Sequence, residues 1–318
     1  MVKLITYPNL VKPPARIENV STAVVRIYVI QCNVSAAGGR AEIRGRSDHT
    51  MQKHSIPCPS QLSRFGFIAF AVLALLNPFD AGAADQKTVK IAVEGAFPPF
   101  NYLDSNQQLQ GFDVDIAKAL CDAGKLTCEF VIQEWTGMIP SLLAGRYDAI
   151  ISSMSMSEER RQKVTFTKRY YDSPTVFISR RNNALQGFNP EDLQGVRLGV
   201  TAGTSQEAYV KQFYSTASVT VFPASPDLYK GLAEGAVELI LEDKLAVYDW
   251  LTNTKAGSCC VFKGADIKNP EFFGDGAGIA LRPDDRQLLQ TMNAALDTIQ
   301  ADGTYDFINA KYFPFEIR

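Results

Sequence analysis

Strand and helix patterns alternate in order from residue 87 onward. Alternating polar and apolar residues predict a strand at 87–94, and apolar residues at helical spacing predict a helix at 112–123. Strands at 127–133 and 147–152, with a helix at 136–144 between them, continue the pattern. This strand–helix–strand–helix–strand order predicts a parallel sheet with right-handed helical crossovers.

A second unit of the same kind follows. Its predicted strands are at 196–200, 219–222 and 237–241, and its predicted helices are at 205–214, 226–234 and 244–252. After it we expect a long loop at 255–278 and an amphipathic helical tail at 284–312. We therefore predict an α/β fold of two lobes, with lobe 1 at 85–172 and 278–318, lobe 2 at 173–277, and hinge strands near 171–175 and 274–279.

The N-terminal part of the chain has the sequence pattern of an export signal. A basic start, an apolar run at 65–76 and small residues before a cleavage point near Ala83 or Ala84 predict a secretory signal peptide at 51–84. The apolar run is shorter than the roughly 20 residues that span a bilayer. We expect residues 1–50 to be a non-native or disordered extension upstream of this signal.

Histidine is confined to this leader, because the chain has 2 His, His49 and His54. A histidine base or a His-ligated metal is therefore not available to the mature chain, which excludes most hydrolase mechanisms. The formal net charge of −2 at pH 7 does not indicate nucleic acid binding. We expect a monomer with no catalytic residue, no metal, no cofactor and no nucleic-acid partner.

Export also permits disulfides. Cys121 and Cys128 lie at the end of a predicted helix and at the start of the next strand, where a bridge would staple the connection. Cys259 and Cys260 are adjacent in the predicted loop, and they are free, joined to each other or paired elsewhere. No pair of these cysteines has the C-x-x-C spacing of a zinc site.

Two open α/β units predict where a ligand would bind. Open sheets bind ligands at the carboxyl ends of their strands, and two such edges facing each other form a cleft. The loops at these ends hold nearly every unusual polar or aromatic residue of the mature chain. The candidate ligand-binding residues are Glu94, Phe97, Trp135, Ser152, Ser153, Ser155, Arg160, Thr201, Ser205, Gln206 and Asp243.

The chemistry of these candidates favours a ligand that carries both a negative and a positive charge. Arg160 follows a serine cluster at 152–155, and together they offer hydroxyl donors and a planar guanidinium suited to a carboxylate. The segment 203–206 opens a predicted helix whose free N–H groups favour the same anion. Each of these residues also has a plainer structural interpretation. Arg160 could be an ordinary surface charge. Thr204 or Ser205, and likewise Asp243, could serve as the N-cap of the helix that follows.

An acid and two aromatic residues indicate a cationic group on the ligand. Phe97 and Trp135 could sandwich an aliphatic stem or stack on a cation, although aromatic residues more often fill cores. Glu94 lies beneath them, and a cation on the ligand would offset the cost of burying its carboxylate.

Several segments of the chain match one known family in order. They are 95–100 (GAFPPF), 111–115 (GFDVD), 139–142 (IPSL), 147–155 (YDAIISSMS), Arg160, 203–209 (GTSQEAY), 273–276 (FGDG) and 302–305 (DGTY). Through them, residues 87–318 resemble the periplasmic amino-acid-binding proteins of ABC importers, specifically the lysine/arginine/ornithine- and histidine-binding group.

The resemblance implies a periplasmic-binding-protein type II fold, a free amino acid ligand, an inner-membrane ABC permease as partner, a periplasmic location and no enzymatic activity. It implies that Arg160 binds the α-carboxylate of the ligand and that Asp243 binds its α-ammonium group. It also implies a disulfide between Cys121 and Cys128.

Two residues depart from the pattern of that group. Glu94 stands where much of the group has aspartate, and related opine-binding proteins can carry glutamate there; Thr201 adds polarity where leucine is common. Arginine, ornithine, lysine or a conjugate such as an opine therefore stay open as ligands. Two other classes are a prephenate or arogenate dehydratase on the same fold and the sensor domain of a receptor. We do not expect the sensor domain, because no membrane span follows before Arg318.

Overall fold

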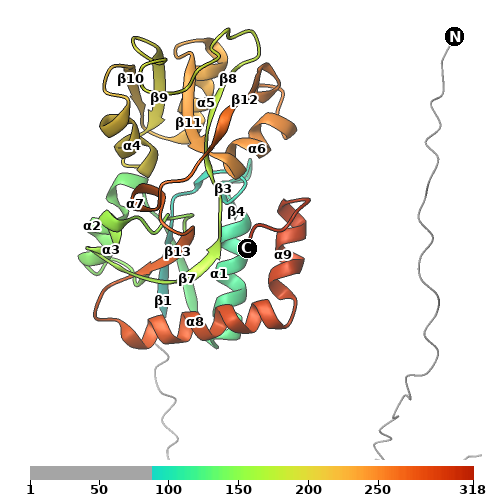
Figure 1. The fold of residues 1–318 in the computed structure, drawn as a ribbon. Helices are drawn as coiled ribbons and strands as arrows, with labels where there is room; N and C mark the ends of the chain where they lie inside the picture. The colour runs from blue at the N-terminus through green and yellow to red at the C-terminus, as the bar shows by residue number, and fades with distance from the viewer. Residues whose placement is uncertain (1–87) are drawn as a thin grey trace, which may run out of the picture. The chain divides into compact units, whose positions relative to one another are not determined.

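The computed structural model describes residues 88–318 (Figure 1). The extension predicted at 1–50 and the signal peptide predicted at 51–84 lie outside these described residues.

The two ends of the described chain build a five-stranded sheet, here called the first sheet, in the order β5-β1-β6-β13-β7. Strand β1 runs parallel to β5 and β6, whereas β13 runs antiparallel to β6 and β7. Its strands are β1 (Val89–Val93), β5 (Cys128–Ile132), β6 (Ala149–Ile150), β7 (Thr165–Tyr171) and β13 (Ala277–Leu281), and its helices are α1 (Phe112–Ala123), α2 (Met138–Leu143), α8 (Arg286–Ala301) and α9 (Thr304–Tyr312).

Successive residues of these strands enter two different cores. Ile91 and Ile279 are buried in a cluster with the apolar stripes of α1 and α8. Ala92 and Ala280 are buried in a second cluster with Met138 of α2. This alternation follows from the two-residue repeat of a strand, and it explains why the sheet needs helices on both faces.

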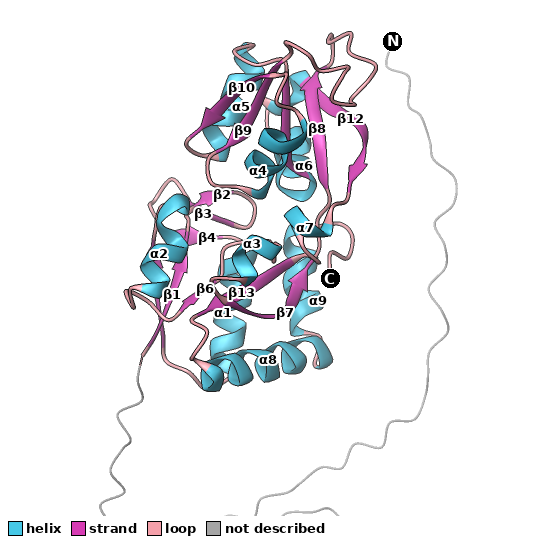
Figure 2. Cartoon of the chain, turned by 60° about the vertical axis from the view of Figure 1, so that its left-hand side comes forward, coloured by secondary structure: helices cyan, strands magenta, loops and turns pink. Residues whose placement is uncertain are grey.

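The second sheet has the order β10-β9-β11-β8-β12. Strand β9 runs parallel to β10 and β11, and β8 runs antiparallel to β11 and β12 (Figure 2). Its strands are β8 (Thr175–Arg180), β9 (Arg197–Thr201), β10 (Ser218–Phe222), β11 (Leu239–Asp243) and β12 (Cys260–Ile267), and its helices are α4 (Ser205–Phe213), α5 (Ser225–Glu234) and α6 (Lys244–Asn253).

Shorter elements complete the described chain. They are a small sheet of β2 (Ala96–Phe97), β3 (Asn101–Leu103) and β4 (Leu109–Gln110), the short helices α3 (Glu158–Arg161) and α7 (Pro270–Phe273), and the single turns η1 (Trp135–Gly137) and η2 (Gly257–Cys259).

The chain passes between the first and second sheets twice. It leaves β7 at Tyr171 and enters β8 at Thr175, and it returns from β12 through α7 to β13. Strand β13 begins at Ala277, which pairs with Tyr171 of the first sheet, although 277 was expected in lobe 2. The lobe boundaries themselves stay a prediction.

The loop predicted at 255–278 is wrong in part, because this segment contains η2, β12 and α7. Strand β12 pairs antiparallel with β8 as an edge strand, with a register shift between Lys263 and Ile267. Gly264 lies in this shift with a φ of +70°, a conformation that glycine adopts at no steric cost. The glycine and the irregular pairing interrupt the alternation from which a strand is recognised.

The tail predicted as helical at 284–312 consists of two helices, α8 and α9. The break falls at Gly303, whose φ of +84° is incompatible with a continuous right-handed helix.

Two disulfides are present within residues 88–318. Cys121 of α1 is bonded to Cys128 of β5, which ties the end of the helix to the start of the strand as expected. Cys259 and Cys260 are bonded to each other at the junction of η2 and β12. Of the three alternatives for Cys259 and Cys260, the structure therefore has the disulfide that joins them to each other.

Candidate functional site

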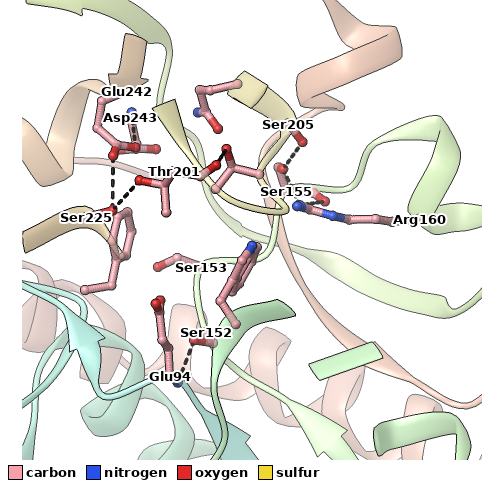
Figure 3. Close-up of a pocket in the computed structure, with 14 residues that line it drawn as sticks. Glu94, Ser152, Ser153, Ser155, Arg160, Thr201, Ser205, Ser225, Glu242 and Asp243 are labelled. Atoms are coloured by element: carbon pink, nitrogen blue, oxygen red, sulfur yellow. Dashed lines mark hydrogen bonds between the residues drawn. The ribbon is translucent and has the colours of Figure 1, made fainter. Parts of the chain in front are cut away.

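One pocket collects all eleven candidate ligand-binding residues (Figure 3). Its volume is about 510 Å³, including the part that is open to solvent. Three further residues line it: Thr204, which the sequence indicated within the anion-favouring segment 203–206 and as an alternative N-cap, and Ser225 and Glu242, which were not among the candidates. The binding role of each residue stays a prediction.

The fold explains why residues so distant in sequence meet. Strands β1 and β6 are parallel, and Glu94 and Ser152 follow their carboxyl ends. Strands β9 and β11 are also parallel, and they end at Thr201 and Asp243. Ser225 begins α5, shortly after the end of β10. The pocket is therefore built at the carboxyl edges of both five-stranded sheets.

The sequence position of Ser225 could have indicated a site residue, because Ser225 lies between the strand predicted at 219–222 and the helix predicted at 226–234. Glu242 contains a weaker signal. It is a charged residue in an otherwise apolar strand, directly before Asp243.

Arg160 forms the cationic end of the pocket. Its side chain is buried, with 7% of the residue exposed, so it is not a surface charge. Nη1 donates to the carbonyl oxygen of Ser155 at 3.0 Å and to Ser155 Oγ at 2.7 Å. Within residues 88–318, no acidic side chain pairs with this guanidinium in a salt bridge. Burial lowers the pKa of Arg160 to about 10, so the group remains charged at neutral pH.

Contacts between the two sheets gather at this same end. Arg160 Nη2 donates to the carbonyl oxygen of Gly203 at 3.3 Å, and Trp135 Nε1 donates to that oxygen at 3.0 Å. The Oγ atoms of Ser155 and Ser205 are 3.0 Å apart. The Arg160 guanidinium also lies 5.1 Å from the centre of the Trp135 ring. Trp135 thus stacks on a cation of the protein itself.

The N-terminus of α4 adds polar groups to the cationic end. Thr204 is the N-cap, and its Oγ1 accepts from the amide of Glu207 at 3.2 Å. The hydroxyl of Ser205 is not used for capping and contacts Ser155 instead. Ser205 and Gln206, the first two residues of the helix, line the pocket. A helix N-terminus favours a negative group.

Asp243 acts as an N-cap and also lines the pocket. Its Oδ1 accepts from the amides of Leu245 and Ala246 at 2.9 and 3.0 Å and from Ser173 Oγ at 2.7 Å. These bonds all use Oδ1, so Oδ2 is not needed to cap α6. Burial raises the pKa of Asp243 to about 6.

Two other carboxyl groups belong to the acidic end. The amide of Glu94 donates to Ser152 Oγ at 3.0 Å, and burial, reinforced by the charge of Glu134, raises the pKa of Glu94 to about 7. Glu242 is 3% exposed, and burial raises its pKa to about 8. Ser225 Oγ donates to Glu242 Oε2 at 3.1 Å.

A buried network holds the loops of the first sheet around the pocket. Asp113 of α1 accepts from Ser153 Oγ at 2.8 Å, from Tyr170 Oη at 2.7 Å and from Asn101 Nδ2 at 2.8 Å. Asn101 Oδ1 in turn accepts from the amide of Gly95 at 2.8 Å. Asp113 therefore connects the Glu94 loop to the Ser152–Ser153 loop without lining the pocket.

Phe97 lines the pocket and also packs against the core beneath it. Its ring stacks on Phe100 with centroids 5.5 Å apart, and Phe100 is fully buried. The core and ligand-facing alternatives for Phe97 are therefore both compatible with its position.

Within residues 88–318, no group of three or more His, Cys, Asp or Glu side chains is arranged to hold a metal ion. Among the helices of this described part, none combines the length and the apolar character that crossing a membrane requires.

Two open α/β sheets with a polar, charge-separated pocket at their facing edges define a solute-binding protein. The family model for bacterial extracellular solute-binding proteins, family 3, matches residues 89–315, and the chain belongs to this family.

Curated relatives cover most of this chain. The L-arginine-binding protein of Pseudomonas aeruginosa is 36% identical over 260 residues, which is 81% of this chain and 98% of that protein. The lysine/arginine/ornithine-binding periplasmic protein of Escherichia coli is 34% identical over 237 residues, or 74% of this chain and 91% of that protein.

Solved structures share the fold. A Salmonella typhimurium periplasmic binding protein described for its high arginine specificity is 28% identical, with a TM-score of 0.65 over 71% of this chain and 99% of that chain. An ancestral amino acid-binding protein, a precursor of cyclohexadienyl dehydratase, is 29% identical, with a TM-score of 0.64 over 71% of this chain and 95% of that chain. The predicted periplasmic-binding-protein fold is confirmed.

Proposed function

We propose that this protein is the periplasmic binding component of an ABC transporter, which binds a basic L-amino acid and delivers it to a membrane permease. The carrying observation is the charge separation of the pocket. The buried Arg160 lies at one end, and the buried Glu242 lies at the other with the half-buried Glu94 and Asp243. The names of the relatives support arginine, lysine or ornithine as the ligand.

The proposed pose places each charge of the ligand against an opposite charge. The α-carboxylate binds Arg160 and the hydroxyl groups near it, and the α-ammonium group binds Oδ2 of Asp243. The cationic end of the side chain extends toward Glu94. Charge-assisted hydrogen bonds of this kind are roughly twice as strong as neutral ones, and exclusion of water strengthens them further.

Lobe closure is the proposed mechanism. The segments that join β7 to β8 and α7 to β13 absorb the dihedral changes, and the contacts of Arg160, Trp135 and Ser155 with the second sheet form as the lobes meet. Because the ligand then lies between carboxyl edges of two sheets, it bridges the lobes and favours the closed state.

We further propose that the protein is not an enzyme. Its structural likeness to a dehydratase precursor makes dehydration of prephenate or arogenate the second candidate. Glu94, with a pKa raised to about 7, could donate a proton, but Asp243, whose pKa of about 6 leaves it mostly ionised at neutral pH, would repel a second carboxylate on the substrate. The same repulsion disfavours an opine. Assaying purified protein for prephenate and arogenate turnover distinguishes the two functions.

Replacing the guanidinium tests the proposed pose. We expect Arg160→Ala to abolish binding of every amino acid, because the α-carboxylate is common to all of them, whereas Glu94→Gln should weaken cationic ligands selectively. Isothermal titration calorimetry with L-arginine, L-lysine and L-glutamine measures both effects.

The neighbouring arginine provides the control for this experiment. Arg161 directs its guanidinium to the carbonyl oxygen of Met156, away from the pocket lining. Arg161→Ala should therefore bind arginine as the wild type does. Normal arginine binding by Arg160→Ala would show that the proposed pose is wrong.

A further inference from the structure

Glu242 is a buried acid of the pocket to which the proposed pose assigns no partner. It is 3% exposed and lines the pocket from the end of β11. Its Oε2 accepts from Ser225 Oγ at 3.1 Å, and its Oε1 accepts from the amide of Asp243 at 2.8 Å. No lysine or arginine of the described chain is ion-paired with it. A buried carboxylate without a cation is unfavourable unless a ligand supplies one.

The groups around Glu242 increase the free-energy cost of ionising its buried carboxyl group. Its neighbour Asp243 and the opposite Glu94 both raise its pKa through their charges, in addition to the effect of burial. Tyr229 of α5 is within electrostatic range and brings no positive charge. Figure 3 shows the Glu94 carboxylate, from the first sheet, pointing toward the end of the pocket where Ser225 and Glu242 lie. Acids from both sheets therefore share one end of the pocket.

A positive group bound between the two lobes relieves this repulsion. A guanidinium carries five N–H donors in a planar fork, which is more than one carboxylate can accept. Glu94 on one lobe and Glu242 on the other would accept hydrogen bonds from N–H groups on different edges of the ligand guanidinium. The lobes would then close fully only around a ligand with a positive charge at this end.

We propose that Glu242 determines specificity by binding, together with Glu94 across the cleft, the cationic end of the ligand side chain, and that cation binding displaces a proton from this pair of acids. This proposal rests on the proposed function and extends it. The proton leaves the carboxyl group for solvent as the ligand cation takes its place, so the charge at the acidic end is conserved.

Two ligands that differ in one group test the charge requirement. L-citrulline has the shape of L-arginine but ends in a neutral ureido group. In calorimetric titrations, we expect Glu242→Gln to bind arginine at least about tenfold more weakly than the wild type, while citrulline binding is unchanged or stronger. The ratio of arginine to citrulline affinity should therefore fall at least about tenfold.

The matched control removes the same charge elsewhere on the second lobe. Glu234 is an exposed acid at the end of α5, and Glu234→Gln should leave both affinities unchanged. Thermal unfolding without ligand checks the folding of each variant. We expect the melting temperature of Glu242→Gln to be no lower than that of the wild type. Glutamine Oε1 can accept from the amide of Asp243 and Nε2 can donate to Ser225 Oγ, without a buried charge.

Proton release is measured first on the wild type and then on the Glu242→Gln variant. Titrating arginine at pH 7 in phosphate and in Tris, whose ionisation enthalpies differ, gives the number of protons released. We expect release with arginine and less release with citrulline, and a smaller arginine value for Glu242→Gln.

The outcomes separate the two proposals. A wild type that binds no amino acid would overturn the proposed function and this inference together. A wild type that binds arginine without releasing protons, or a Glu242→Gln variant with an unchanged affinity ratio, would overturn this inference and leave the proposed function standing.

Discussion

Two polar side chains buried near the acidic end of the pocket differ in how they are satisfied. Glu242 accepts two hydrogen bonds, whereas the hydroxyl of Tyr229, which is 4% exposed, has no hydrogen-bond partner within residues 88–318. The Tyr229 ring still contributes to packing, because it stacks on Trp250 with centroids 5.0 Å apart. Its hydroxyl group therefore lowers stability while its ring raises it.

Tyr229→Phe should stabilise the protein. The change removes an unpaired buried hydroxyl and keeps the stacked ring, so we expect the free energy of unfolding to rise by about 1 kcal/mol. Tyr305→Phe is the control, because Tyr305 Oη donates to the carbonyl oxygen of Tyr170 at 2.6 Å and its loss should lower stability by about 1 kcal/mol. Urea denaturation measures both. A destabilised Tyr229→Phe variant would mean that the hydroxyl has a partner.

Most individual residues of the site could be predicted from the sequence, but the contacts that they make with one another could not. The loops after predicted strands indicated eleven lining residues, because the carboxyl edge of a parallel sheet follows from strand order alone. Ser225 and Glu242 were missed for different reasons. Ser225 resembles an ordinary helix start, and Glu242 lies in a strand where alternation does not tell which neighbour faces the cleft.

At the scale of elements, regular segments were predicted well and irregular ones were not. Helix α1 has the predicted bounds, because its apolar residues recur at helical spacing and Gly111 precedes it. Strand β12 was missed because Gly264 and a register shift interrupt it, and its pairing with β8 depends on the tertiary fold. The break between α8 and α9 depends on the backbone conformation of Gly303.

The disulfide between α1 and β5 joins two secondary-structure elements, and its contribution to stability can be tested by mutation. It closes a short loop, with 7 residues of sequence separation. Replacing both Cys121 and Cys128 by alanine should lower the free energy of unfolding by about 2–3 kcal/mol through the entropy of the unfolded chain. Denaturation of the double variant against the oxidised wild type measures this. Arginine affinity should stay unchanged, since neither cysteine lines the pocket; a large loss of affinity would contradict this account.

At the scale of the whole molecule, the acids of the pocket make both stability and ligand affinity depend on pH, with opposite signs. The pKa values of Asp243, Glu94 and Glu242 are raised to about 6, 7 and 8, so the folded protein without ligand keeps protons that the unfolded chain has released. Their contribution to stability is therefore present at low pH and is lost as pH rises through these values. A bound cation needs the ionised forms, so its affinity rises over the same interval.

Thermal unfolding between pH 5 and pH 8 should show both trends. We expect these groups to lower the melting temperature of the free protein as pH rises, and we expect the increase caused by saturating L-arginine to become larger. Asp113, with a pKa raised to about 6 by burial, adds to the first trend but not to the second, because it does not line the pocket. Glu242→Gln removes the group with the highest of these pKa values and should flatten both trends above pH 7. An arginine-induced shift that is constant from pH 5 to pH 8, or largest at pH 5, would mean that the ligand cation does not meet these carboxylates.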